Sequence, residues 1–296
     1  MRLAILIILF LITAFCAKNA LSADISIGNA PWGEELILID GEISTGDLIK
    51  ILELSKKLLL KNKELQFRLN SSGGDFFEAL DIGKFIKKLH ARTMIVGEIS
   101  RDPSKPLTNC FSSCFLIFTS GSIRDYNGNN QIFDSSGNKL VKTIPVLGIH
   151  RPKINPAQFG SLSPNDAKAS YKMIFQDASK FLSDSGVPKD IIDEMFRVSS
   201  QEIRLITKEE FIKRIGFTQA YFAEWIQDKC GALEKKELKD LAEIRALRIL
   251  SNDSEIIPKS MSEGYVNYLI KKQNQINFCK TNTLISHQKS VLIIDD

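Results

Sequence analysis

The most chemically suggestive residue in this chain is a serine that lies between two cysteines. Ser112 stands between Cys110 and Cys114, directly before the apolar run 115–118. The start of a helix presents unpaired backbone N–H groups and the positive end of the helix dipole. A serine hydroxyl becomes a nucleophile when a base removes its proton and N–H donors stabilise the oxyanion. Ser112 is therefore the predicted nucleophile. Helix capping is the alternative, because serine is a common N-cap.

Two glycines upstream predict the oxyanion donors. Gly73 and Gly74 end the turn at 70–74, between an expected strand and an expected helix. Glycine lets a backbone amide approach a bound carbonyl closely, because it has no side chain. The amides of Gly74 and Ser113 are the predicted oxyanion hole, and Gly73 is the predicted substrate contact. The alternative is an ordinary turn, for which Ser-Gly-Gly is common.

The predicted general base is one of three histidines. His150 directly follows the apolar run 146–149, at the expected C-terminal end of a parallel strand. Active sites of open α/β sheets lie at that end. His90 instead ends an amphipathic, lysine-rich helix, and His287 lies in a polar segment. His150 is thus the predicted base, and a packed or surface histidine is the alternative.

Strands and helices are expected to alternate along most of the chain. The alternation predicts right-handed crossovers and a largely parallel sheet covered by helices, which is an α/β domain. The expected strands are 35–41, 65–69, 93–96 and 146–149, and the expected helices are 45–60, 76–89, 164–183, 188–198 and 208–215.

Two segments depart from this alternation. Residues 124–146 contain Asn-Gly and Ser-Ser-Gly-Asn among isolated β-formers, which predicts an inserted hairpin or flap. From residue 229 onward the pattern is charged and helical, with helices expected at 233–250 and 263–278 and a strand or frayed tail at 291–296. We therefore predict an α/β domain over 24–228 and a helical C-terminal extension over 229–296.

The first 23 residues have the layout of a secretory signal peptide. Arg2 precedes the apolar run 3–15, and small or polar residues follow through Ala23. The apolar run is shorter than the ~20 residues that span a bilayer. We expect an exported protein, periplasmic or secreted. The alternative is an uncleaved N-terminal segment that anchors the chain to a membrane.

The cysteines and the net charge limit which bonds, metals and partners this protein is expected to have. After the leader, an even number of cysteines remains, which predicts two disulfides in an exported protein. Of the three pairings, we favour Cys110 with Cys114 and Cys230 with Cys279. The alternative is a zinc site formed by Cys110, Cys114 and His150. Such a site would have few protein ligands. The net charge of +4 gives no argument for a nucleic-acid partner, and we predict no metal and no cofactor.

The order of these residues resembles the Clp-type serine proteases of the Clp/crotonase superfamily, and in particular exported Clp-like proteins. The resemblance covers about 36–220 and is carried by the turn at 70–74, the Cys-Phe-Ser-Ser-Cys segment at 110–114 and Ile-His-Arg-Pro at 149–152. It implies a crotonase-like fold of repeated βαβ units. It also implies Ser112 as nucleophile, His150 as base, and an acid later in the chain.

Three features depart from the family pattern. Ser72 stands where the family's turn usually has proline, and the 124–146 segment lengthens the interval between the nucleophile and the base. The family's acid falls shortly before the segment 206–210, where this chain has no aspartate. Glu202 is the best substitute for the acid, with Asp193 as the second choice.

These residues together predict a serine hydrolase that cleaves peptides through an acyl-enzyme. An extended peptide would lie beside Gly73 and Gly74, as in β-strand addition, and the resemblance implies a homo-oligomer. One alternative is a catalytically inactive protein of the same fold that binds peptides or a small acyl ligand. Another is a membrane-anchored enzyme that resembles signal peptide peptidases.

Overall fold

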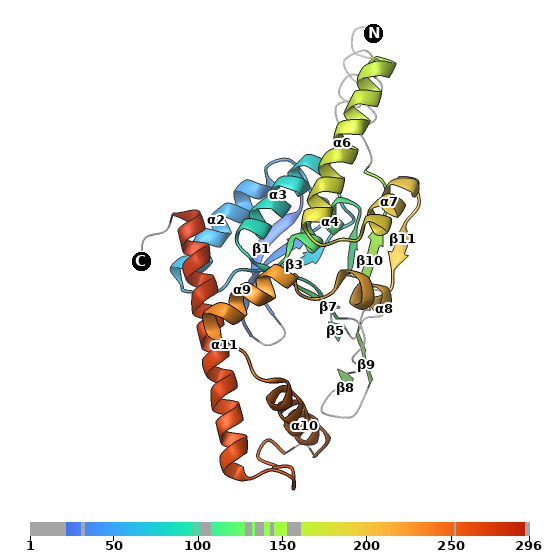
Figure 1. The fold of residues 1–296 in the computed structure, drawn as a ribbon. Helices are drawn as coiled ribbons and strands as arrows, with labels where there is room; N and C mark the ends of the chain where they lie inside the picture. Colours follow the sequence, from blue (N-terminus) through green and yellow to red (C-terminus); the bar gives the residue numbers. More distant parts are fainter. Residues whose placement is uncertain are drawn as a thin grey trace, which may run out of the picture.

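The structure is a computed structural model that describes residues 22–30, 33–96, 99–100, 108–127, 132–133, 139–142, 145–152, 161–251 and 253–293 (Figure 1). Residues 1–21, and with them most of the predicted signal peptide, lie outside the described residues. None of the helices within the described ranges has the length and apolar character that crossing a membrane requires.

A five-stranded sheet forms the centre of the molecule, with the order β1-β2-β3-β4-β7. The β1 strand is antiparallel to β2, and the other neighbours are parallel. Helices α2, α3 and α4 connect the parallel strands and pack beside one another. The bounds are β1 Asp24–Asn29, β2 Glu35–Asp40, α2 Asp47–Leu60, β3 Gln66–Asn70, α3 Phe76–Lys88, β4 Arg92–Val96, α4 Ser113–Ser120 and β7 Ile123–Asn127.

Two smaller sheets complete the strands of the described residues. In the first, β10 is parallel to β6 and antiparallel to β11. The second is antiparallel, with the order β5-β9-β8. The α/β prediction is therefore confirmed, but the sheets are mixed, so the mostly parallel sheet is seen only in part. The bounds are β5 Ile99–Ser100, β6 Asn109–Phe111, β8 Ile132–Phe133, β9 Lys139–Lys142, β10 Val146–Ile149 and β11 Arg204–Ile206.

The helices expected at 164–183, 188–198 and 233–250 are found within two residues of their predicted bounds, whereas the helix at 220–230 was not expected. The segment 208–215 is not one α-helix as predicted, because its second half is a turn of π-helix, η1. The final helix continues to Leu292, so the predicted strand is wrong for 291–292, and 294–296 lie outside the described residues. The bounds are α6 Pro164–Asp184, α7 Lys189–Arg197, α8 Lys208–Glu210, η1 Phe211–Ile215, α9 Ala220–Cys230, α10 Lys235–Ser251 and α11 Glu263–Leu292.

The predicted insertion at 124–146 begins too early. Its first residues belong to β7, the last strand of the central sheet, and only β8 and β9 form the expected hairpin pairing. Arg124 is the first residue of the predicted insertion, yet its side chain is buried. Its Nε donates to the Gly121 carbonyl at 3.0 Å, and its Nη2 donates to the Ser185 carbonyl. These carbonyl partners allow a charged residue in a core strand.

The C-terminal extension docks on the α/β unit through α11, the long red helix of Figure 1. The buried side chain of Gln288 accepts from the Leu65 N–H at 3.0 Å and donates to the Leu89 carbonyl at 3.2 Å. The Cys230–Cys279 disulfide ties α9 to α11, as the favoured pairing predicts. The domain boundary at 229 stays a prediction.

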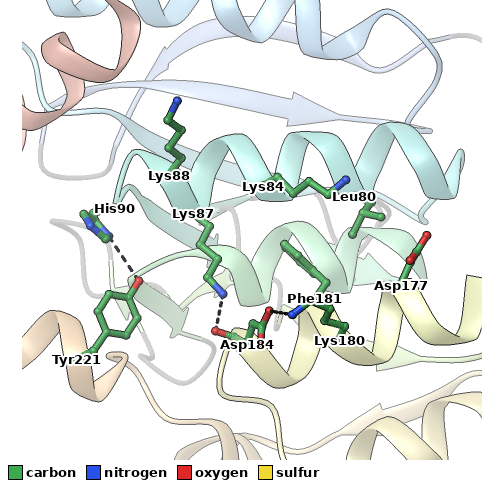
Figure 2. A pocket seen from close by; sticks show the side chains of 10 residues that line it. All are labelled: Leu80, Lys84, Lys87, Lys88, His90, Asp177, Lys180, Phe181, Asp184 and Tyr221. Atoms are coloured by element: carbon green, nitrogen blue, oxygen red, sulfur yellow. Dashed lines mark hydrogen bonds and ion pairs between the residues drawn. The ribbon is translucent and has the colours of Figure 1, made fainter.

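Two stacked histidines join this extension to the turn after α3. His90 has a left-handed backbone (φ 50°), and its ring stacks on that of His287 with centroids 4.8 Å apart. The Nδ1 atom of His90 lies 3.4 Å from the Tyr221 hydroxyl, as Figure 2 shows. Burial, and secondarily the charge on His287, lowers the pKa of His90 from its usual 6.5. The folded protein therefore favours a neutral His90 ring.

We expect this pair to make the fold sensitive to acid. Because the folded-state pKa of His90 is depressed, its contribution to stability is present above pH 6.5 and is lost as the pH falls through the folded-state pKa. Urea-unfolding midpoints at pH 7 and pH 5 measure the loss. The His90→Asn variant should lose less stability over this interval, since asparagine tolerates the left-handed backbone. A His150→Asn control should keep the full loss, and an equal loss in His90→Asn would contradict the assignment.

Candidate active site

Ser112 lies in a sharp turn between β6 and α4 and has a strained backbone. Its φ is 56° and its ψ is −125°, which is rare for a residue other than glycine. The side chain is 7% exposed and makes no capping hydrogen bond to α4. The capping alternative is therefore not what places a serine here. Strained backbone of this kind clusters at functional sites, and sharp strand-to-helix turns present nucleophilic serines in hydrolases.

The glycine turn packs directly against this serine. Gly73 has φ 104°, and a Cβ added to it would lie 2.7 Å from the Ser112 Cβ and 3.0 Å from the Phe111 carbonyl oxygen. Any side chain at position 73 would therefore push Ser112 or its strand away. This contact is the closest link between the two sequence motifs, and it requires glycine for both space and conformation.

The backbone of Ile43 holds the glycine turn from its other side. The Ile43 N–H donates to the Gly73 carbonyl, and its own carbonyl accepts from the Asp75 N–H, both at 2.8 Å. The Ser71 hydroxyl accepts from the Gly73 N–H at 3.1 Å. A Cβ on Gly74 would lie 2.1 Å from the Ile43 carbonyl oxygen, so position 74 also requires glycine. Sequence reasoning missed Ile43, because it acts only through main-chain atoms.

The two predicted oxyanion donors belong to two segments that a side-chain hydrogen bond joins. The N–H groups of Gly74 and Ser113 donate none of the hydrogen bonds found within the described part of the chain. Ser113 is the first residue of α4, where backbone N–H groups have no intrahelical partner. Its hydroxyl donates to the Gly74 carbonyl at 3.1 Å and so joins the two segments. Both amides are thus available to a developing oxyanion.

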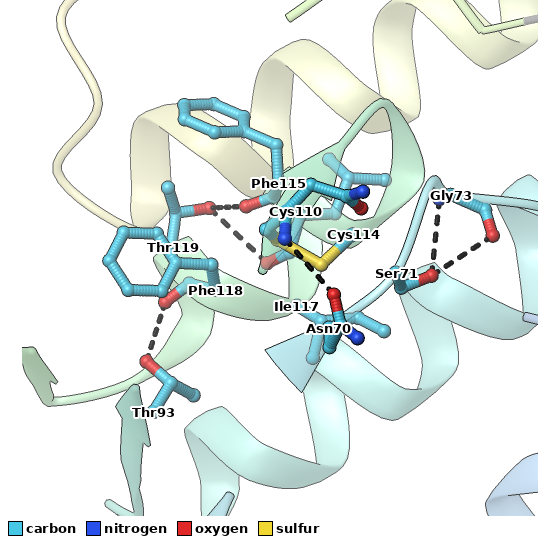
Figure 3. Close-up of a disulfide and its surroundings, with 12 residues drawn as sticks. Asn70, Ser71, Gly73, Thr93, Cys110, Cys114, Phe115, Ile117, Phe118 and Thr119 are labelled. Atoms are coloured by element: carbon cyan, nitrogen blue, oxygen red, sulfur yellow. Dashed lines mark hydrogen bonds between the residues drawn. A yellow bond between two sulfur atoms is a disulfide. The ribbon is translucent and has the colours of Figure 1, made fainter. Parts of the chain in front are cut away.

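A disulfide and backbone hydrogen bonds hold this arrangement together (Figure 3). Cys110 and Cys114 are bonded, with Cα atoms 5.2 Å apart, so the bridge spans Ser112 from β6 to the first turn of α4. The Ser71 N–H donates to the Asn109 carbonyl at 2.8 Å, and the Phe111 N–H donates to the Ser71 carbonyl at 3.0 Å. Because the cysteines are joined to each other, the zinc alternative is wrong.

His150 lies past the end of the strand beside β6. In the parallel register of β6 and β10, Gly148 is opposite Phe111, so Ser112 and His150 both follow the carboxyl ends of neighbouring strands. The His150 Nδ1 is 2.9 Å from the Arg151 carbonyl oxygen. A carbonyl only accepts, so Nδ1 is the donor in this contact. The neutral tautomer that has its proton on Nδ1 is the one whose Nε2 can act as a general base. No hydrogen bond joins His150 to Ser112 in this structure.

The structure does not bring either predicted acid into contact with His150. Glu202 is exposed two residues before β11, and its hydrogen bond within the described residues runs from its backbone N–H to the Ser199 carbonyl at 3.1 Å. Asp193 forms an ion pair with Lys189 at 2.6 Å on the exposed face of α7. Among the described residues, the partner that orients the His150 ring is the Arg151 carbonyl, which has no side-chain signal in the sequence. The identity of the acid stays a prediction.

A cavity lies away from Ser112, between α3, α6 and the start of α9 (Figure 2). It measures about 680 Å³ and has several lysines on its walls. Lys180 pairs with Asp184 at 3.2 Å, and Lys87 donates to the Asp184 carbonyl. These lysines are bound to groups of the protein itself, and none of the lining residues belongs to the serine site.

A scan against protein-family models finds no family that matches this chain. A search of curated proteins finds no similar protein. The residues around Ser112 therefore have to support any functional assignment by their own geometry.

Proposed function

We propose that this chain is an exported, Clp-like serine hydrolase of the crotonase fold that cleaves peptides through an acyl-enzyme on Ser112. The observation that carries the proposal is the strained backbone of Ser112, which is held against Gly73 beside two unused amides. Two disulfides, typical of an oxidising compartment, support export. Assembly into a homo-oligomer and anchoring through the N-terminal segment stay predictions.

The proposed reaction gives each of these groups one role. The Nε2 of His150 takes the proton from the Ser112 hydroxyl as its oxygen attacks the peptide carbonyl carbon. The carbonyl oxygen becomes an oxyanion that accepts from the Gly74 and Ser113 N–H groups. The C–N bond then breaks, and His150 returns the proton to the leaving amine. Water hydrolyses the acyl-enzyme by the same steps. An extended peptide would lie beside the Gly73–Gly74 turn, where Gly74 is exposed.

Labelling with a fluorophosphonate tests the nucleophile. We expect the purified protein to form an adduct on Ser112 that peptide mass mapping locates, because an activated serine attacks the phosphorus and releases fluoride. The Ser112→Ala variant should give no adduct, and His150→Ala should label at least about a hundredfold more slowly, the lower range of general-base contributions.

An exposed serine provides the matched control. Ser251, on α10, lies in the helical extension, so Ser251→Ala should label at the rate of the parent protein. Circular dichroism checks that each variant is folded. Labelling spread over several serines, or labelling of Ser112 that does not need His150, would contradict the proposal.

The second candidate function is peptide binding without catalysis by the same site. It is favoured by one observation: within the described residues no carboxylate contacts His150. If a folded parent protein forms no adduct, binding of extended peptides near Gly73 becomes the function to test, by fluorescence anisotropy with a labelled peptide library.

A further inference from the structure

A separate cavity of about 620 Å³ lies at the opposite end of the central sheet from Ser112. Gln66 and Arg92 are the first residues of β3 and β4, whereas the serine site adjoins the other end of β3. Helices α9 and α11 close the cavity from the side of the C-terminal extension. Its volume is in the range of small-molecule sites.

The sheet side of this cavity carries more acceptors than its neighbours satisfy. Gln66 is 5% exposed, and its Nε2 donates to Glu34 at 2.7 Å, which leaves its buried Oε1 without a partner. The Glu64 carboxyl group makes no hydrogen bond or ion pair within the described part of the chain. The Nε of Arg92 also lacks a partner, but Asp125 neutralises the guanidinium at 2.8 Å.

The helix side of the cavity combines an apolar patch with polar residues, which are Gln227 of α9 and Asn277, Lys280 and Thr281 of α11. Phe222 and Ile226 of α9 pack with Leu284 of α11 in a buried cluster, and Ile123 lies against it. A ligand that fills this cavity therefore meets carboxylates and an amide oxygen at one end and a hydrophobic wall at the other. The charged residues that line the cavity are Glu34, Glu64, Arg92 and Lys280. Because Asp125 pairs with Arg92, the carboxylates at the sheet end favour a cation there. The described residues contain no group of three or more metal-ligating side chains that would favour a metal ion.

We propose that this cavity binds a small primary amine, whose ammonium group lies at Glu64 and Gln66 and whose carbon skeleton packs on Phe222, Ile226 and Leu284. An ammonium group has three donors and no acceptor, which matches a carboxylate beside an unpartnered amide oxygen. A charge-assisted hydrogen bond to Glu64 is stronger than a neutral one. The apolar wall gains affinity from each methylene that it buries.

Binding should depend on pH through Glu64. Burial raises the pKa of Glu64 to about 7, while the charge of Arg92 opposes the shift and that of Glu34 adds to it. Lys280 faces the cavity from α11. A bound cation favours the ionised carboxylate, so binding below pH 7 is expected to release a proton and affinity is expected to rise from pH 6 to pH 8.

Isothermal titration of the full chain with hexylamine tests the site, with hexanol and hexanoate as neutral and anionic controls of equal length. We expect hexylamine to bind at least about tenfold more tightly than either control, which corresponds to one charge-assisted hydrogen bond. The Glu64→Gln variant should lose about the same factor. The Glu53→Gln variant, at an exposed position of α2, should bind as the parent does.

A second variant fills the cavity from α9 and leaves Glu64 unchanged. It therefore tests binding even if the Glu64→Gln variant does not fold. Ala223 is exposed on α9 and lines the cavity, so Ala223→Trp should fill it and abolish hexylamine binding while the helix stays folded by circular dichroism. The proposal is overturned if hexanoate binds as well as hexylamine, if no probe binds to the folded parent, or if Glu64→Gln and Ala223→Trp both bind like the parent.

Discussion

Replacing Gly73 by alanine is expected to slow fluorophosphonate labelling of Ser112 at least about a hundredfold, because displacement of reacting groups by about 1 Å has effects of this size. The added Cβ would lie 2.7 Å from the Ser112 Cβ, and the residue has φ 104°, which alanine adopts only with strain. Either the serine or the turn that carries the Gly74 amide must therefore move. The labelling rate and the urea-unfolding midpoint are measured on the same preparation.

Gly186 provides the matched control for this substitution. It also has a positive φ, 77°, but an added Cβ would meet no atom within 4 Å. The Gly186→Ala variant therefore has the backbone strain without the collision. Its Ser112 should be labelled at the rate of the parent protein, while its stability falls modestly. If folded Gly73→Ala labels Ser112 at the parent rate, the contact between turn and serine has no role in reactivity.

Replacing Arg124 by alanine is expected to lower the free energy of unfolding by roughly 2–3 kcal/mol, because it leaves the buried Ser185 carbonyl without a donor, at about 1–3 kcal/mol, and opens a cavity. The guanidinium donates to the Ser185 and Gly121 carbonyls, and the Gly121 carbonyl also accepts from the Gln219 Nε2 at 3.0 Å. Burial lowers the pKa of Arg124 to about 10, so the side chain remains charged at neutral pH. Urea unfolding at pH 7 measures the change.

Two further variants separate the causes of this loss. Arg124→Met keeps much of the buried volume but removes the donors, so it should recover only the part of the loss that comes from the cavity. Arg245→Ala, at an exposed position of α10, should change stability by less than about 0.5 kcal/mol. A loss for Arg124→Ala no larger than that of Arg245→Ala would contradict the structural role assigned to the guanidinium.

Elements with strong apolar periodicity could be predicted from the sequence. Helix α3 and strand β3 lie within one residue of their expected bounds, because the spacing of apolar residues and the flanking turn residues act locally. Short strands that contain polar residues could not be predicted from the sequence. β7 contains arginine, aspartate and asparagine, and it is a strand because β4 lies beside it and Arg124 finds carbonyl partners.

The candidate site could be predicted to a similar extent. Ser112, the glycine turn and the Cys110–Cys114 pairing were all expected from residue types and short spacings, and the structure brings these residues together. The acid could not be found in this way. Glu202 was chosen by its distance along the chain, but the orientation of the His150 ring depends on the neighbouring Arg151 carbonyl, and backbone acceptors leave no pattern in a sequence.

The sequence by itself determined the α/β class, the candidate nucleophile and the cysteines that bracket it, because each depends on residues close together along the chain. Only the tertiary structure decided that Ser112 has a strained backbone, that Gly73 contacts it, and that Ser113 bonds to Gly74 across 39 residues. These features depend on the register between strands far apart in sequence. That register is set by packing of the whole sheet, which no local pattern specifies.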